Sequence, residues 1–285
     1  MQTGPTIQQF METFPNDDAC LEYLMHLRHG EHIDCPKCGK HGKFHRVRRH
    51  PAYECAWCGF EIFPMVGTPF HRSHVPLQKW FYAIYLFTTT RHGVPAKELQ
   101  RQLGISYPSA LRMAHRIREY MGQIDGDPPM TGHVELDEAY IGGRGKGFDG
   151  RSTEQKTPVF GMLERGGELY MRAVERVNKA TLFPHIERLV PKGTKVSTDE
   201  WRAYASLRKI GYDHQVVRHA AKEYARGETH VNTLENVWMH LKRGIRGTHI
   251  HVSRKHLPKY LAEFEFRYNR RKRPGTMFAE LLASL

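Results

Sequence analysis

The second half of the chain alternates between two periods of apolar positions. Strand-length apolar runs occupy residues 134–141, 158–164, 169–177, 195–199 and 214–217. Apolar positions that return every three or four residues occupy residues 181–189, 201–207 and 232–243. Gly166-Gly167 separates the second and third strand-length runs and predicts a hairpin turn. The order is three strands followed by helices and strands in alternation, which predicts an α/β domain.

The first half is mostly helical by the same criterion. An amphipathic pattern predicts a helix at residues 17–27, with Asn16 as its N-cap. Residues 77–88 read as a buried, aromatic-rich helix. A third pattern lies near the other end of the chain, where residues 257–268 predict an amphipathic helix that ends in a basic run.

Residues 94–117 carry the pattern of a helix-turn-helix. A short helix is expected at residues 96–103, followed by a turn at Gly104 and a second helix capped by Ser106. In this motif the second helix enters the major groove of DNA. Three arginines of that helix are positioned to reach phosphates or base edges: Arg112, Arg116 and Arg118. A helical hairpin with a basic surface and a purely structural role has the same pattern.

An acid interrupts the strand expected at residues 134–141. Asp137 lies in the middle of this apolar run, and burying an unpaired carboxylate is costly. Asp199 ends a later strand, and Glu235 lies on the helix expected at residues 232–243. The alternative is a strand whose acids face solvent. If the three acids converge, they form a site.

Such a set of acids has the chemistry of a magnesium site. Mg²⁺ takes oxygen ligands and keeps several waters. Two ions roughly 4 Å apart would activate a water or hydroxyl and stabilise the leaving oxygen of a phosphodiester. Asn232, Glu235 and Lys242 lie on one stripe of the same helix, and Lys242 can pair with a phosphate.

Four cysteines near the start of the chain are spaced for zinc. Cys35-Pro-Lys-Cys38 and Cys55-Ala-Trp-Cys58 are two knuckles with sixteen residues between them, and each is followed by Gly. Four thiolates in this arrangement can close a tetrahedron around one Zn²⁺. Two disulfides are the alternative, which the lack of a signal peptide at Met1 disfavours. Cys20 is left over and is expected to be a buried thiol.

The charge of the chain indicates a polyanionic partner. The net charge is +13, and residues 201–285 hold 17 Lys or Arg against 7 Asp or Glu. A membrane surface would also attract this charge, but we find no run of roughly 20 apolar residues. We therefore expect a cytoplasmic partner of double-stranded DNA. The basic run at residues 270–273 has two interpretations, contact with phosphate and a solvated helix end.

Six stretches, in this order, match one known family: Cys35-Pro-Lys-Cys38, residues 96–106, Leu136-Asp-Glu-x-Tyr-Ile-Gly-Gly143, Ser197-Thr-Asp-Glu-Trp-Arg-Ala-Tyr204, residues 230–243 and residues 252–270. The chain resembles bacterial insertion-sequence transposases of the DDE type, specifically the fifteen-ninety-five insertion-sequence family with an N-terminal zinc ribbon. The resemblance implies a ribonuclease H-like mixed-sheet catalytic core preceded by a zinc ribbon and a helix-turn-helix domain.

The resemblance also implies an activity. It predicts binding to terminal inverted repeats and strand cleavage and transfer that depend on Mg²⁺ or Mn²⁺, two ions per active site, in a bacterial nucleoid-associated protein. Asp137 and Asp199 match the first two catalytic positions, and Glu235 is our choice for the third over Asn232 and Asn236. Asn232 and Lys242 would support the site. The DNA-binding set is Arg112, Arg116, Arg118, Arg243, Arg270 and Arg271.

These expectations divide the chain into three regions. Residues 1–64 hold the first helix and zinc ribbon, residues 65–125 the helix-turn-helix, and residues 126–285 the catalytic domain with its basic C-terminal helix. A glycine-rich basic loop is expected at residues 142–147. We expect a homodimer or higher oligomer on DNA. The alternative functions are a DNA-binding regulator whose ribonuclease H-like domain is inactive, and a non-transposing nuclease of that fold.

Overall fold

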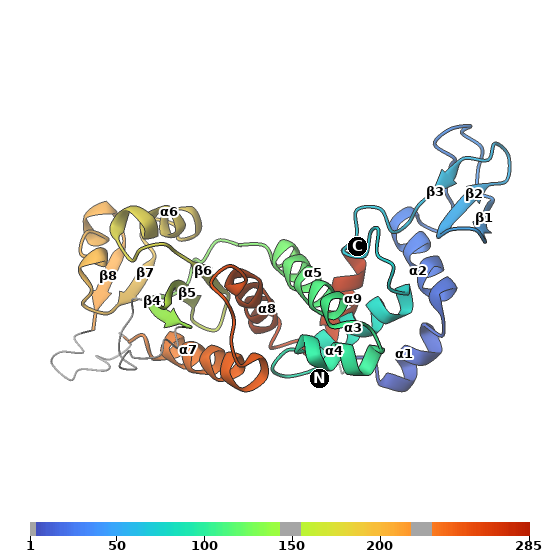
Figure 1. The fold of residues 1–285 in the computed structure, drawn as a ribbon. Coiled ribbons are helices and arrows are strands. Elements are labelled where there is room, and N and C mark those ends of the chain that lie inside the picture. The colour runs from blue at the N-terminus through green and yellow to red at the C-terminus, as the bar shows by residue number, and fades with distance from the viewer. Residues whose placement is uncertain (1–3, 143–154, 218–229) are drawn as a thin grey trace. The chain divides into compact units, whose positions relative to one another are not determined.

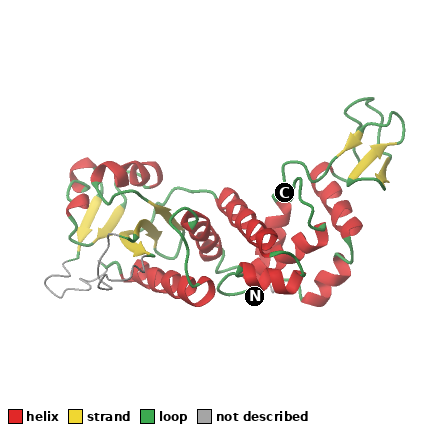
Figure 2. Ribbon diagram, viewed as in Figure 1, coloured by secondary structure: helices red, strands yellow, loops and turns green. Residues whose placement is uncertain are grey.

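The computed structural model describes residues 4–142, 155–217 and 230–285. The chain forms two compact units, Met1–Tyr120 with Arg273–Leu285, and Met121–Lys272. Figure 1 traces the chain through both units, and Figure 2 separates their helices from their strands. The basic loop expected at residues 142–147 lies, beyond Gly142, outside the described residues.

The first unit contains a small antiparallel sheet that carries the cysteine knuckles. Its strands, in the order β1-β2-β3, are β1 (Phe44–Val47), β2 (Ala52–Cys55) and β3 (Glu61–Ile62). Gly39 and Gly59 close the two knuckles with φ of 67° and 69°, a region that glycine enters without steric cost. Their N–H groups donate to the carbonyls of Cys35 and Cys55. Both knuckles therefore share one turn geometry.

Helices form the rest of the first unit. They are α1 (Ile7–Thr13), α2 (Asp17–His29), α3 (Leu77–Thr89), α4 (Ala96–Leu103), most of α5 (Tyr107–Asp125), and α9 (Met277–Ala283). The expected N-cap of α2 is confirmed, because the Asn16 side chain accepts from Ala19 N. Phe10 and Phe14 contact Phe278 of α9, so the end of the chain completes this core.

The turn between α4 and α5 has the form that the sequence predicts. Gly104 ends α4 in the left-handed region, at φ 58° and ψ 43°. The Ser106 hydroxyl then accepts from Ser109 N, 3.3 Å away, at the start of α5. The short helix, the glycine turn and the capping serine are confirmed as structural elements.

A five-stranded mixed sheet forms the centre of the second unit. Its strands are β4 (Val134–Ile141), β5 (Thr157–Glu164), β6 (Leu169–Ala173), β7 (Lys195–Thr198) and β8 (Asp213–Val216). The order across the sheet is β6-β5-β4-β7-β8. β4, β5 and β6 pair antiparallel, whereas β7 is parallel to β4 and β8 is parallel to β7. The mixed α/β architecture is thus confirmed.

Helices cover both faces of this sheet (Figure 1). On one face α6 (Lys179–Leu189) packs over a core that includes Val134 and Leu136 of β4. On the other face α7 (Asn232–Gly244) and α8 (Leu257–Asn269) pack over a core that includes Ala139 and Ile141. Side chains of a strand alternate between faces, so β4 contributes to both cores.

Two expected elements are shorter in the structure. The helix expected at residues 201–207 is wrong, because the chain makes only a 3-10 turn there, Arg202–Tyr204. The Asp199 carboxylate accepts from Trp201 N and holds the chain in a turn. Tyr204 then packs into the core on the face of the sheet that α6 covers. β6 ends at Ala173, rather than at residue 177, because its pairing with β5 ends at Val159.

Candidate functional site

The acids of β4 lie on opposite faces of one strand. Asp137 is on the face covered by α7, where Trp238 Nε1 donates to Asp137 Oδ2 at 2.9 Å. Glu138 turns toward the other face, where the hydroxyl of Tyr204 donates to Glu138 Oε2 at 2.8 Å. Both carboxylates are only partly exposed. The middle of one strand therefore presents two neighbouring acids, one on each face of the sheet.

The sheet register brings Asp199 to the same place. β7 runs parallel to β4, with Val196 opposite Val134 and Ser197 opposite Glu135. Extending this register by two residues sets Asp199 beside Asp137. The negative charge of Asp199 acts on both Asp137 and Glu138, consistent with this proximity. Two of the three expected catalytic acids thus come together through adjacent parallel strands.

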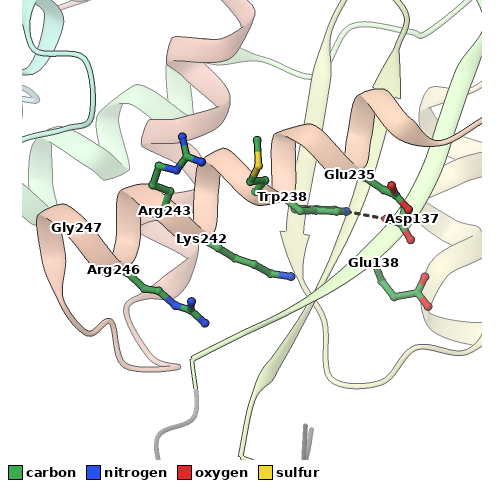
Figure 3. Close-up of a pocket in the computed structure, with 9 residues that line it drawn as sticks. Asp137, Glu138, Glu235, Trp238, Lys242, Arg243, Arg246 and Gly247 are labelled. Carbon is green, nitrogen blue, oxygen red and sulfur yellow. Dashed lines mark hydrogen bonds between the residues drawn. The ribbon is translucent and has the colours of Figure 1, made fainter. Parts of the chain in front are cut away.

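α7 brings the third acid. Asp137, Glu138 and Glu235 line one cavity of about 800 Å³ with Trp238 and Lys242. Figure 3 shows the three acids at one end of this cavity and the cations of α7 toward the other. Asn232 and Asn236, the other candidates for the third position, are not among the residues that line it, and neither is Asp199, which adjoins Asp137 from the end of β7. The third carboxylate in this cavity is therefore Glu235.

A glycine on β5 allows α7 to approach the acids. Gly161 is paired with Asp137 across the sheet, and the Trp238 ring lies over it. A Cβ at Gly161 would come within 2.5 Å of Trp238 Cζ2, which is closer than such contacts allow. Gly161 therefore lets the indole reach the Asp137 carboxylate.

Burial and mutual repulsion make it difficult for the acids of this site to ionise. Burial raises the pKa of Asp137 to about 8, and the charges of Glu138 and Asp199 add to this rise. Burial also raises the pKa of Glu138 to about 7, with a further contribution from Asp199. Oxygen donors that repel one another in a partly desolvated site fit a hard divalent cation, which would relieve that repulsion. The donor set therefore fits Mg²⁺ or Mn²⁺.

The raised pKa of Asp137 predicts how stability depends on pH. Between roughly pH 4 and pH 8 the folded chain holds a proton on Asp137 that the unfolded chain releases, so stability falls as pH rises through this window. Asp137→Asn removes this effect. We expect the variant to melt several degrees above the wild type at pH 8 without added divalent ions, and the difference to vanish below pH 4. Thermal melts across this range measure it, and a pH-independent difference would refute it.

The cysteines form a second possible metal site. The four thiols of Cys35, Cys38, Cys55 and Cys58 lie within 4.8 Å of one another. Cys35 Sγ is 3.6 Å from Cys58 Sγ, and Cys38 Sγ is 3.9 Å from Cys55 Sγ. Zn–S bonds of about 2.3 Å in a tetrahedron require Sγ···Sγ edges of roughly 3.8 Å. The four cysteines could therefore hold a structural zinc.

The donor oxygens of the carboxylates do not lie as close together as the four thiols do. Within the described parts of the chain, the cysteines are the group of three or more potential ligands whose donor atoms come that close together. Asp137, Asp199 and Glu235 share a region without meeting at one point. Mutual repulsion between these carboxylates favours such a spacing.

The expected DNA-binding arginines fall into two groups. Arg243 lines the cavity, Arg112 is exposed on α5, and Arg271 is exposed in the turn after α8, where it donates to Gly167 O. Two others are buried. Arg118 donates to Val94 O and lies over the Phe87 ring, and Arg270 pairs with Asp125. We assign Arg118 and Arg270 a structural role and do not include them in the proposed DNA-binding surface.

Arg116 is intermediate between the two groups. It is half-buried, and its guanidinium donates to the carbonyls of Pro69 and His71. These bonds hold the loop before α3 against α5. A substitution at this position would therefore disturb the fold as well as any interface, which leaves Arg112 as the clean probe of α5.

Sequence reasoning missed several residues of this site. Glu138 follows Asp137 directly, but the pattern gave no reason to prefer a second acid. Arg246 and Gly247 also line the cavity, from a π-helical turn that continues α7. The signal for Trp238 was present, because it lies three residues after Glu235 on the buried side of an amphipathic helix.

Comparison with known sequences gives consistent matches along the chain. Residues 129–269 match the ISXO2-like transposase domain, and residues 15–61 match the transposase zinc-ribbon domain. A protein described as an uncharacterized protein in transposable element ISH50, from Halobacterium salinarum, is 28% identical over 93% of this chain and 95% of its own length. An uncharacterized transposase-like protein of Haemophilus influenzae is 30% identical over 36% of this chain and 81% of its own.

A solved structure gives a weaker match. It is a chain of the simian T-cell lymphotropic virus intasome in complex with PP2A regulatory subunit B56 gamma. The match has a TM-score of 0.31 at 14% identity and covers 64% of each chain. This similarity is too low to assign a fold.

Within the described residues, no helix is both long and apolar enough to cross a membrane.

Proposed function

Because the chain belongs to the ISXO2-like transposase family, we propose that it binds the terminal inverted repeats of its insertion sequence and catalyses DNA strand cleavage and strand transfer. One observation carries this proposal: Asp137, Glu138 and Glu235 line a single cavity with Lys242. Asp199 is brought beside Asp137 by the parallel register. The acids and the nearby cations can together hold both the metal and the DNA backbone.

Each residue of the cavity, and Asp199 beside it, has a separate task in this proposal. The carboxylates of Asp137, Asp199 and Glu235 hold divalent cations, and Trp238 orients Asp137 through its N–H. Two Mg²⁺ or Mn²⁺ ions, when bound, supply activation of the attacking hydroxyl and stabilisation of the leaving oxygen. Lys242, Arg243 and Arg246 pair with phosphates that enter the cavity. The mixed sheet with acids on adjacent strands supports a ribonuclease H-like core.

The first unit has the separate task of locating the DNA. We propose that α4 and α5 act as a helix-turn-helix on the element ends, and that the zinc ribbon contributes further phosphate contacts. Joining two ends to one target requires two active sites, which supports a homodimer or higher oligomer on double-stranded DNA. The protein would act in the bacterial cytoplasm, where the nucleoid lies.

The proposal is tested with DNA that contains the flanks of the element's own reading frame. Labelled end fragments are incubated with the protein, with and without Mg²⁺. Mg²⁺-dependent cleavage at the repeat boundary followed by joining supports a transposase. Specific binding without cleavage supports the regulator, and cleavage without joining supports the nuclease.

The role of α5 makes a separate prediction. Arg112→Ala should weaken binding to element ends more than binding to random DNA, because a lost base contact costs about 1–3 kcal/mol and a lost phosphate contact is independent of sequence. Binding isotherms on both DNAs measure the ratio. Arg101→Ala is the comparison: Arg101 is exposed on α4, the helix of the motif that crosses the DNA backbone, so any loss should be equal on both DNAs. Equal losses on both DNAs for Arg112→Ala would leave α5 with phosphate contacts alone.

A further inference from the structure

A third acid of β4 is more deeply buried than the two acids of the candidate site. Glu135 is 0% exposed and does not line the cavity. A buried carboxylate is tolerated only when charge and hydrogen bonds compensate its lost hydration. Arg165 Nε donates to Glu135 Oε1 at 2.7 Å, and His230 Nδ1 lies 3.2 Å from the same oxygen. Arg165 also donates to His230 O, so these partners form one network.

The other partners of Glu135 belong to the start of α7. The Thr233 hydroxyl donates to Glu135 Oε1 at 2.9 Å, and Leu234 N donates to Glu135 Oε2 at 3.0 Å. The first N–H groups of a helix have no partner within the helix. The N-cap residue of α7, Val231, supplies no side-chain bond. Glu135 therefore caps α7 from the neighbouring strand, and its charge suits the positive end of the helix.

This cap connects the two elements that carry the expected metal ligands. Glu135 and Asp137 are two residues apart on β4 and so face the same side. Leu234, which Glu135 binds, directly precedes Glu235. One turn later the same helix is bound to Asp137 through Trp238. Two attachments therefore fix how far Glu235 lies from Asp137.

We propose that Glu135 is the positioning residue of the active site, which holds α7 on β4 so that Glu235 and Asp137 have the spacing that a divalent cation requires. The inference rests on the proposed function, since it takes both acids as metal ligands. Glu135 itself touches neither metal nor DNA. Its effect passes through the backbone of α7.

Glu135→Gln in the full-length chain is the informative change. Both oxygens of Glu135 accept hydrogen bonds, whereas an amide offers one accepting oxygen and one NH₂ group. In either orientation the NH₂ therefore faces a donor. We expect Mn²⁺ affinity to fall at least tenfold, within the range seen when residues that orient metal ligands are replaced. Titration of Mn²⁺ followed by electron paramagnetic resonance measures this without relying on cleavage.

A matched control separates positioning from general destabilisation. Glu265 is also buried, accepts from Met171 N at 2.8 Å and pairs with Arg172, but these contacts attach α8 to β6 rather than to α7. Glu265→Gln should lower the melting temperature as Glu135→Gln does, yet bind Mn²⁺ as the wild type. Thr233→Val removes one bond to Glu135 from the helix side and should weaken Mn²⁺ in the same direction, with a smaller effect.

The outcomes distinguish this inference from the proposed function. The inference is supported if the wild type binds Mn²⁺ and Asp137→Asn abolishes this binding. Glu135→Gln and Thr233→Val should then weaken it, and Glu265→Gln should leave it intact. If Asp137→Asn abolishes binding but Glu135→Gln and Thr233→Val do not change it, the inference alone is wrong. An equal loss in Glu265→Gln also overturns it. If the wild type shows no Mn²⁺ binding that depends on Asp137, both the metal site and the inference fail.

Discussion

Asp137→Asn is expected to reduce DNA strand cleavage by several orders of magnitude while leaving binding to element ends intact or slightly stronger. The amide keeps the shape of the carboxylate and can still accept the bond from Trp238 Nε1. It removes a negative charge that holds the metal and repels phosphate. Because residues of a metal centre act as a unit, losing one removes most of the rate. Single-turnover cleavage and gel-shift titrations on the same DNA separate the two effects.

The other acids rank the candidates for the third position. Asp199→Asn and Glu235→Gln should behave like Asp137→Asn, whereas Asn232→Ala should be milder, because a neutral amide holds a divalent cation less tightly than a carboxylate does. The same assays apply. A large loss in Asn232→Ala with a small loss in Glu235→Gln would transfer the third position to Asn232.

Loss of one zinc-site cysteine is expected to unfold the ribbon while the second unit stays folded. Cys35→Ser or Cys58→Ser leaves an incomplete set of thiolates, and structural zinc contributes roughly 10 kcal/mol or more to the folding of such small domains. The small sheet of β1, β2 and β3 buries few residues and depends on this contribution. Limited proteolysis should cut residues 30–64 first, and the zinc content should fall from one ion per chain toward none.

The fifth cysteine provides the control for this prediction. Cys20 is buried in α2, and burial raises the pKa of its thiol to about 12, so it stays protonated and lies outside the group of four. The Cys20→Ala variant should contain as much zinc as the wild type. Freshly purified protein without zinc, or a Cys35→Ser variant with full zinc content, would contradict the zinc assignment.

The secondary structure could be predicted where one pattern dominates a segment. The helix at residues 232–243 has its apolar residues at helical spacing, and the structure places α7 at Asn232–Gly244. The cysteine knuckles were equally clear, because four thiols at that spacing have few other uses. Residues 201–207 were predicted wrongly, since the bond from Trp201 N to the Asp199 carboxylate is a local contact that apolar periodicity does not report.

The acids of the site could be predicted from the sequence, but the hydrogen-bond partners that position them could not. Asp137 stood out because a carboxylate interrupts an apolar strand. Glu135 has the same character, yet its proposed role depends on partners from two other segments: Thr233 and Leu234 at the start of α7, and Arg165 directly after β5. The burial of Arg118 was equally hidden, because its partner Val94 is 24 residues away in the chain.

Asp137, Asp199 and Glu235 are proposed to form one metal-dependent centre for DNA cleavage. The most direct measurement is single-turnover cleavage of labelled element-end DNA by the full-length wild type and by Asp137→Asn, each with and without Mg²⁺. We expect cleavage at the repeat boundary by the wild type with Mg²⁺, and none without Mg²⁺ or in the variant. Cleavage that persists in Asp137→Asn at the wild-type rate would contradict this mechanism.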